Sequence, residues 1–231
     1  EAQAIKLLKT RVDNNFSKAI GLILKTKGRV IVSGMGKTGI IANKFSATLA
    51  STGTPSLFLH TAEAIHGDLG KVTNDDIVVI LSNSGSSDEM KQLLPLLKKI
   101  GSPIIALTGN TKSVLAKYSD VVLDVSVKKE ACILGLAPTA STTAALAMTD
   151  ALAVCLLEQK GFKEKDFAFF HPGGAIGRRL LLKVEDLMRS GQFNPVVCED
   201  NLVSEVLFAI TRARSGCATV VDKQGKLKGI F

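Results

Sequence analysis

Aromatic side chains are scarce in this sequence, which has no tryptophan, one tyrosine and 5% aromatic residues in all. Proteins that hold single-stranded nucleic acid stack the bases on aromatic rings, so nucleic acid is not an expected partner. The net charge is +8, and seven basic but only two acidic side chains lie in residues 1–30. Apolar residues recur every three or four positions through residues 1–27, which predicts a helix whose charged side faces solvent.

Cysteine is also sparse, and the four cysteines show none of the short spacings that form metal or redox sites. Cys132, Cys155, Cys198 and Cys217 are therefore expected to be free thiols in a reducing compartment, the cytoplasm. No uninterrupted apolar run reaches the roughly 18 residues of a membrane helix, so no membrane association is expected. With 46% hydrophobic residues, the 231-residue chain has enough apolar material for a large core.

Short apolar runs alternate with stretches of helical spacing through most of the chain. Five runs are bounded by turn residues and are typical of buried parallel strands, at residues 30–33, 56–59, 77–81, 104–107 and 121–125. Helical spacing covers residues 37–51, 88–100, 111–118 and 139–160. This order predicts an α/β fold with a doubly wound, five-stranded parallel sheet flanked by helices, in which ligands bind beyond the carboxyl ends of the strands.

The pattern changes near the end of the chain. After a short segment at residues 194–197, a helical run covers residues 202–214, and two β-like runs cover residues 218–222 and 227–231. We therefore expect two domains, residues 1–183 and a smaller α+β unit at residues 184–231, which is below the size that usually folds alone.

The loop after the first expected strand, residues 34–39, matches the G-x-G-x-x-G pattern of dinucleotide sites. Such a site also needs a carboxylate after the second strand, which here ends at His60. A P-loop would need a glycine at position 31, which is Ile31. Two interpretations remain: a helix N-terminus that offers backbone amides and Lys37 to an anion, or a tight turn with a solvated lysine.

The loop after the third expected strand, residues 82–89, contains four serines around Gly85 just before a helix. Hydroxyl groups together with first-turn amides are typical of a phosphate cradle. The alternative is a helix cap only, with Ser86 and Glu89 as a capping box. We favour the cradle, because a single cap does not need four serines. Ser82, Ser84 and Ser87 are the expected phosphate ligands.

The sequence holds three histidines, His60, His66 and His171, and all three fall at expected strand ends or in loops. Together with Glu89 and Glu130 they form a set of acids and bases suited to proton transfer. A single loop histidine is more often a surface residue than a catalyst, so the set carries more weight than any one member.

Seven stretches in order carry a family resemblance, at residues 34–39, 51–55, 64–70, 82–85, 129–132, 136–139 and 171–175. They resemble the arabinose 5-phosphate isomerases, which have a sugar isomerase (SIS) domain followed by two cystathionine-β-synthase-type (CBS) modules. The resemblance covers nearly the whole chain. It implies that residues 184–231 are most of the first CBS module and that the second module is absent.

The resemblance implies an aldose-ketose isomerase that interconverts D-ribulose 5-phosphate and D-arabinose 5-phosphate, the first step towards the Kdo sugar of lipopolysaccharide or capsule. It places Lys37, Glu89, Glu130 and His171 in catalysis. It assigns substrate binding to Gly53, Thr54, His60 and His66, and it agrees with the three serines as phosphate ligands. It implies no required cofactor, with His60 and His66 as candidates for an inhibitory or incidental zinc ion. One departure is Ser86, where relatives often have a glutamate.

The chemistry of such an isomerase can be matched to the residues. A proton moves between C1 and C2 of the open sugar, and negative charge develops on an enediolate. Glu89 or Glu130 is expected to move that proton, provided that burial raises its pKa. His171 suits proton transfer at the ring oxygen, and Lys37 supplies positive charge for the oxyanion or the phosphate. The sequence does not decide between the two glutamates.

The resemblance also implies a homotetramer with sites at subunit boundaries, in which His171 serves its own site or a neighbour's. It implies a nucleotide or nucleotide-sugar effector at intact CBS modules. Two other functions stay open: a phosphosugar-binding regulator without catalysis, and an isomerase or epimerase of a different phosphosugar. Binding alone would not need Glu89, Glu130 and His171, which disfavours the regulator.

Overall fold

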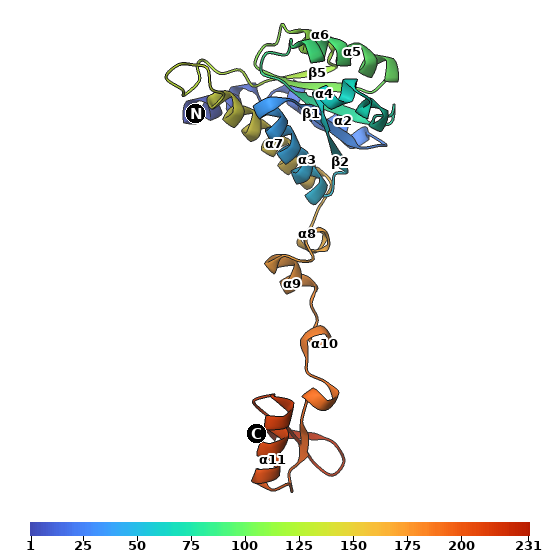
Figure 1. Ribbon diagram of the computed structural model, residues 1–231, viewed down its shortest axis with the longest axis vertical. Helices are drawn as coiled ribbons and strands as arrows, with labels where there is room; N and C mark the ends of the chain where they lie inside the picture. Colours follow the sequence, from blue (N-terminus) through green and yellow to red (C-terminus); the bar gives the residue numbers. More distant parts are fainter. The chain divides into compact units, whose positions relative to one another are not determined.

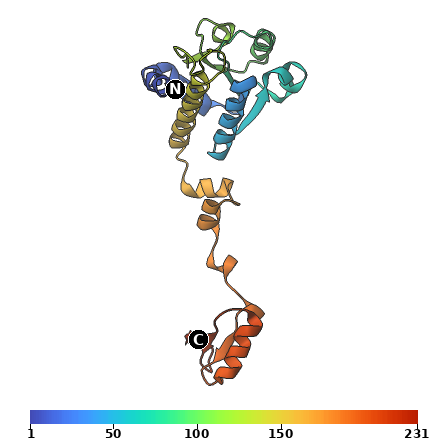
Figure 2. The same cartoon turned by 60° about the vertical axis from the view of Figure 1, so that its left-hand side comes forward.

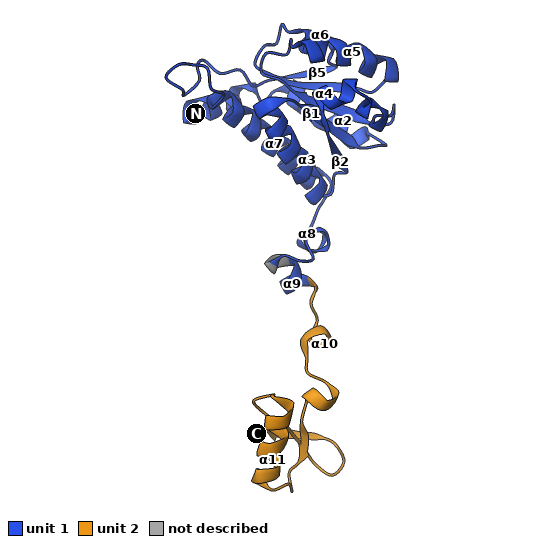
Figure 3. Ribbon diagram, in the orientation of Figure 1, with its two compact units in different colours: residues 1–180 blue, residues 181–231 orange. Residues whose placement is uncertain are grey.

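The computed structural model describes residues 1–174 and 177–231 and divides the chain into two compact units (Figure 3). The first unit is Glu1–Leu180 and the second is Leu181–Phe231. Helix α9, Ala175–Leu181, lies where the first unit ends. Ala175, the last residue of the stretch 171–175, lies outside the described residues.

The first unit is built on a five-stranded sheet whose strands all run parallel, in the order β2-β1-β3-β4-β5. The strands are β1 Val30–Gly34, β2 Ser56–His60, β3 Ile77–Leu81, β4 Ile104–Thr108 and β5 Val121–Asp124. All residues of β1, β3 and β4 are buried, because helices cover both faces of the sheet. The predicted α/β fold is confirmed, with strand ends shifted by one residue at most.

Helices form a layer on each face of the sheet (Figures 1 and 2). One layer holds α1 Ala2–Leu8, α2 Asn14–Lys25, α3 Gly36–Ser51 and α7 Ala140–Gln159. The other holds α4 Thr61–Ile65, α5 Asp88–Ile100 and α6 Val114–Tyr118. Short 3-10 turns cover Lys9–Arg11 and Asp68–Lys71, and α8 spans Glu164–Phe170. Alternate residues of β1 face opposite layers, with Val32 packed in the first and Ile31 in the second.

The N-terminal segment is two helices, so the prediction of one helix over residues 1–27 is wrong. The carboxylate of Asp13 accepts hydrogen bonds from the backbone N–H groups of Asn15, at 2.8 Å, and Phe16, at 3.4 Å. This carboxylate satisfies amides that a new helix leaves unpaired, so α2 begins there and α1 ends before it. The apolar spacing continues across the break, which is why the pattern alone did not reveal it.

Helix α7 has 20 residues and is, within the described part of the chain, the one helix long and apolar enough to span a membrane by length and composition. Its apolar residues are interrupted by Ser, Thr and Asp150, so it is not an uninterrupted apolar run. Half of its apolar window is buried inside the first unit, where Ala144, Ala145 and Met148 pack in the core. This burial is typical of the core helix of a globular domain.

The second unit contains a three-stranded sheet in the order β6-β7-β8, in which β6 and β7 are parallel and β7 and β8 antiparallel. Its elements are α10 Val184–Leu187, a 3-10 turn at Gly191–Phe193, β6 Val196–Cys198, α11 Val203–Ala213, β7 Thr219–Val221 and β8 Leu227–Ile230. Large apolar side chains of this unit, such as Phe208 and Ile230, are exposed. Its assignment to a CBS module stays a prediction.

Candidate active site

The carboxyl ends of the five strands meet at one edge of the sheet, and most of the predicted site residues follow them. β2, which follows β1 in the chain, lies on one side of β1, and β3 lies on the other side. The direction in which strands are added therefore reverses between β1 and β3. Gly34 at the end of β1 pairs in register with Leu81 at the end of β3. The glycine loop and the serine loop therefore lie side by side at the switch point, where open α/β sheets bind ligands.

The glycines of the first loop are explained by close packing between β1 and α3. A Cβ atom on Gly34 would lie 3.1 Å from the Cα atom of Gly39 and 3.0 Å from the carbonyl oxygen of Thr38. The side chain of Lys37 is exposed in the first turn of α3. The glycine spacing therefore serves the tight turn, and a role of the exposed Lys37 in anion binding stays a prediction.

The segment that follows β4 packs against the serine loop and holds its backbone in place. Gly85 has a φ of +63°, and a Cβ atom there would lie 2.3 Å from the Ser113 hydroxyl oxygen. The backbone N–H of Leu115 donates a hydrogen bond to the Gly85 carbonyl at 2.9 Å. Only glycine fits this position without strain, so the loop has one defined shape.

Backbone hydrogen bonds fix the side chains of two predicted phosphate ligands, Ser82 and Ser87. The Ser82 hydroxyl oxygen accepts from the Gly85 N–H at 3.1 Å, and the Ser87 oxygen accepts from the Met90 N–H at 3.4 Å. A hydroxyl that accepts from an amide keeps its own proton for another partner. Ser84 is exposed. Ser87 is the residue that caps α5, so a capping box from Ser86 is wrong.

Glu130 lies in the segment that follows β5 and makes its contacts with the start of α7. Its Oε2 atom accepts three hydrogen bonds, from Thr139 N at 2.9 Å, Thr139 Oγ1 at 3.1 Å and Ser141 N at 3.1 Å. Partial burial raises the pKa of Glu130, but these donors together with the Ser141 side chain outweigh it and lower the pKa to about 2. The expectation of a raised pKa is wrong for this glutamate.

Sequence reasoning did not assign roles to Thr139 and Ser141. The stretch 136–139 belongs to the family resemblance, and a threonine directly before a helix is a common capping residue. That signal indicated the helix start but not the carboxylate it binds. Glu130 also lines a cavity of about 570 Å³, together with Lys6, Lys128 and Lys129.

His60 and His66 lie at the carboxyl edge of the sheet. His60 ends β2, and His66 directly follows α4. The Nδ1 atom of His60 is buried and has no hydrogen-bond partner within the described residues. His66 is exposed. Across residues 1–174 and 177–231, no group of three or more His, Cys, Asp or Glu side chains is placed to hold a metal ion. Two histidines do not complete a zinc site, which takes at least three protein ligands.

Glu89 lies in the first turn of α5, at the same carboxyl edge as the serine loop. Gly53, Thr54 and His171 lie at the opposite edge of the sheet. Gly53 and Thr54 precede β2, so they lie at the amino ends of the strands. Lys160, just after α7, donates from Nζ to the Gly53 carbonyl at 3.1 Å, and the Phe162 ring packs against Gly53. Phe162 in turn stacks on Phe170 at 6.1 Å between ring centroids. His171, the next residue, therefore belongs to the same end of the unit.

The two groups of site residues are separated by the length of α7. Glu130 binds the first turn of this helix, whereas Gly53 contacts the residue after its last turn. Twenty helical residues span about 30 Å. Within one chain, Gly53, Thr54 and His171 are therefore not brought together with the serine loop, Lys37 or Glu130.

The imidazole of His171 is held in one orientation by Phe167. Its ring stacks on the Phe167 ring at 3.9 Å, and its Nδ1 atom lies 2.9 Å from the Phe167 carbonyl oxygen. A carbonyl only accepts, so Nδ1 carries the proton in this contact. Nε2 of the neutral ring is then left as a proton acceptor.

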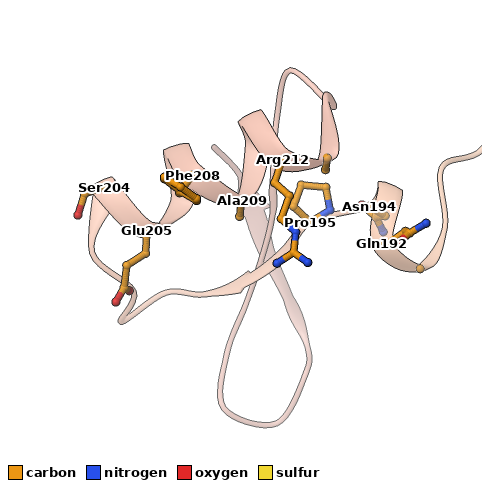
Figure 4. A pocket seen from close by; sticks show the side chains of 10 residues that line it. Gln192, Asn194, Pro195, Ser204, Glu205, Phe208, Ala209 and Arg212 are labelled. Atoms are coloured by element: carbon orange, nitrogen blue, oxygen red, sulfur yellow. The ribbon is translucent and has the colours of Figure 1, made fainter.

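The second unit has a cavity of its own, of about 750 Å³ (Figure 4). It lies between α11 and the segment before β6. Phe208 and Arg212 line it from the helix, and Gln192, Asn194 and Pro195 line it from the segment. A mixed apolar and polar lining of this kind is typical of small-molecule sites.

Comparisons with known proteins agree with the fold and the resemblance. The SIS domain family matches residues 23–155. Arabinose 5-phosphate isomerase KdsD of Pseudomonas aeruginosa is 54% identical over 231 residues, which are 100% of this chain and 71% of that protein. KdsD of Escherichia coli K12 is 48% identical, again over 100% of this chain and over 70% of that protein.

A solved structure extends the comparison to three dimensions. A protein of Escherichia coli CFT073 in complex with arabinose 5-phosphate aligns with a TM-score of 0.69 and 44% identity, covering 73% of this chain and 92% of that one. Identity at this level over this length indicates common descent of fold and family. The chain belongs to the SIS domain family and, within it, to the arabinose 5-phosphate isomerases.

Proposed function

We propose that this chain is the isomerase that interconverts D-ribulose 5-phosphate and D-arabinose 5-phosphate, the first step towards Kdo. The observation that carries the proposal is the 54% identity to KdsD over the whole chain. The serine loop at the switch point of the sheet supports it, because this is where an anionic ligand is expected in such folds.

The phosphate binds at the serine loop in this proposal. Ser82 and Ser87 each accept an amide hydrogen bond and donate their O–H protons to phosphate oxygens. Ser84, exposed at the tip, donates a third. The first-turn amides of α5 add the favourable end of the helix dipole. These contacts are the same for ketose and aldose, so they anchor the substrate without favouring either direction.

Glu89 is the carboxylate that we assign to proton transfer. It takes the C1 proton of ribulose 5-phosphate, the C1–H electrons form the C1–C2 double bond, and the C2 carbonyl oxygen becomes the enediolate oxyanion. Lys37 stabilises that charge. The carboxyl group exchanges this proton with water and then delivers a proton to C2. The O1 proton passes to the C2 oxygen, so that O1 becomes the aldehyde oxygen and the C2 oxygen becomes a hydroxyl. Glu130 fits this role poorly, since a base with a pKa of about 2 is a weak proton acceptor at neutral pH.

Glu130 is assigned a different task. Its Oε2 atom is occupied by Thr139 and Ser141, and its Oε1 atom makes none of the hydrogen bonds found among the described residues. A carboxylate fixed in this way accepts a hydrogen bond from a sugar hydroxyl and orients C1 and C2 towards Glu89.

His171 completes the site from a neighbouring copy of the chain, in a homotetramer. The separation of about 30 Å along α7 supports this arrangement, because Nε2 of His171 is otherwise far from the serine loop. Gly53 and Thr54 lie at the same edge as His171 and are assigned to the same neighbouring site. His171 transfers the proton at the ring oxygen when the cyclic aldose opens or closes.

Three further features have no part in the proton transfers of this scheme. His60 and His66 are assigned to the substrate pocket, and binding of an incidental or inhibitory zinc ion by these two histidines stays a prediction. The cavity lined by Phe208 and Arg212 is the candidate effector site of the second unit, for a nucleotide or nucleotide sugar. The four free cysteines fit a reducing, cytoplasmic setting.

Isomerisation in deuterated water tests the proposed function. The purified protein is incubated with ribulose 5-phosphate, and the product is analysed by NMR. Arabinose 5-phosphate that carries deuterium at C2 is the expected result. Binding of ribulose 5-phosphate without any turnover would support the regulator instead, and a different product sugar would support another phosphosugar isomerase.

A further inference from the structure

Thr139 occupies a junction between three parts of the first unit. It is the last residue before α7, it follows the loop of residues 131–138, and it contacts Glu130 on the other side of that loop. Its hydroxyl oxygen accepts from the Ala131 N–H at 2.8 Å and donates to Glu130 Oε2 at 3.1 Å. One side chain thus uses both its donor and its acceptor capacity to connect the two ends of the loop.

The loop that Thr139 closes has little else to hold it. The side chains of Ile133, Leu134 and Leu136 are all more than three-quarters exposed, so apolar burial does not anchor the loop. At its tip the Gly135 N–H donates to the Cys132 carbonyl at 2.9 Å, a contact within the loop itself. The hydrogen bonds at its base, between Glu130, Ala131 and Thr139, are therefore its main connection to the domain.

The same contacts fix the carboxylate of Glu130. Two of the three donors to Oε2 belong to Thr139, through its backbone N–H and its hydroxyl. The backbone donor stays after any substitution, whereas the hydroxyl is lost in valine and kept in serine. Removing the hydroxyl takes away one of the three donors to Oε2 and leaves the Ala131 N–H without its acceptor.

We infer that Thr139 is a positioning residue of the isomerase, which acts through Glu130 by holding the carboxylate in its productive orientation and by closing loop 131–138. This inference rests on the proposed function, in which Glu130 orients the sugar. It assigns Thr139 no contact with the substrate.

Thr139→Val and Thr139→Ser separate the hydroxyl from the size of the side chain. The valine variant is expected to lose about tenfold in kcat with little change in KM, because the phosphate contacts stay intact while the sugar is misplaced. The serine variant keeps the hydroxyl and is expected to stay within about twofold of the parent. Thr142→Val is the matched control, since the Thr142 hydroxyl donates to the Thr139 carbonyl within the helix and does not contact Glu130.

A double-mutant cycle with Glu130→Gln tests the path of the effect. If Thr139 acts through Glu130, the valine substitution costs little further activity in the glutamine background. Independent multiplication of the two losses would overturn the inference, as would a valine variant with unchanged kcat, or equal losses in Thr139→Val and Thr142→Val.

Hydrogen exchange keeps the inference separate from the proposed function. The amides of Ala131, Thr139 and Ser141 are expected to exchange faster in Glu130→Gln, and that of Ala131 also in Thr139→Val. A parent protein without isomerase activity would end the proposed function. Unchanged exchange at Ala131 in Thr139→Val would instead overturn the positioning contact, whatever the activity.

Discussion

The two edges of the sheet in the first unit differ in what they offer to a substrate. The carboxyl edge holds the serine loop, Lys37 and the Glu130 contacts, all directly after strands. The amino edge holds Gly53 and Thr54, with His171 beside them through the Phe162 and Phe170 rings. Within one chain, the predicted site residues are therefore divided between the two edges. Motifs that follow one another in the sequence therefore need not share one site. Here the residues of the carboxyl edge lie at the start of α7, and those of the amino edge lie at its end.

Mixing inactive variants is the strongest test of that division. Lys37→Ala and His171→Ala are each expected to lose about 10²-fold or more in kcat, since each removes a group that handles charge or a proton. After subunit exchange of an equal mixture, about a quarter of the sites combine an intact Lys37 with an intact His171 if pairing is random. Activity of the mixture in the ribulose 5-phosphate assay should rise to about that fraction of the parent activity.

The matched control for this mixture combines two variants of the same edge. Lys37 and Glu89 follow neighbouring strands of one chain, so Lys37→Ala mixed with Glu89→Ala should show no recovery. Recovery in the control pair, or none in the Lys37 and His171 pair after proven exchange, would contradict a site built from opposite edges of two copies.

Much of the fold was predictable, because its signals are local. β1, β3 and β4 are buried on both faces and appear in the sequence as continuous apolar runs, and the switch point follows from the order of β and α segments. The helix break at Asp13 was missed, since a cap is one side chain inside a continuing apolar pattern. The pKa of Glu130 was also missed, because the loop of residues 131–138 separates Glu130 from Thr139 and Ser141, and no local sequence pattern places these donors beside it.

Gly85→Ala tests whether the carboxyl edge binds the phosphate through one defined loop shape. Gly101, at the other end of α5, also has a positive φ, of +90°, but has open space around its Cα atom. Both substitutions cost about 1 kcal/mol of backbone strain, which thermal unfolding will show. Only Gly85→Ala also collides with Ser113. We expect KM for ribulose 5-phosphate to rise about tenfold or more for Gly85→Ala and to stay unchanged for Gly101→Ala. Equal KM values would contradict a phosphate site at this loop.

Two serines of the same loop separate phosphate binding from helix capping. Ser87→Ala is expected to raise KM and also to lower stability by about 1 kcal/mol, because it removes the cap of α5. Ser84→Ala is expected to raise KM by a similar factor without a change in stability, as Ser84 is exposed. Kinetics and urea unfolding on both variants check this, and an unchanged KM in both would remove the serines from the site.

Carboxylates at both edges make the stability of the unit depend on pH in the same direction. Desolvation raises the pKa of Asp76, at the amino edge, but backbone and side-chain donors of Arg29 and Thr73 outweigh it and lower the pKa. The pKa of Glu130, at the carboxyl edge, is lowered from 4.5 to about 2. When the pKa of a carboxylate is lower in the folded state, its contribution to the free energy of unfolding is fully present above the unfolded pKa and is lost as pH falls through the folded pKa.

Glu130→Gln should therefore cost about 1 kcal/mol at neutral pH and progressively less below pH 4.5, as urea unfolding of variant and parent at several pH values will show. Asp76→Asn should show the same decline, starting near the ordinary aspartate value of 3.8. A deficit for Glu130→Gln that stays constant down to pH 2.5 would mean that its charge is not what binds α7, and that the two edges are stabilised by different chemistry.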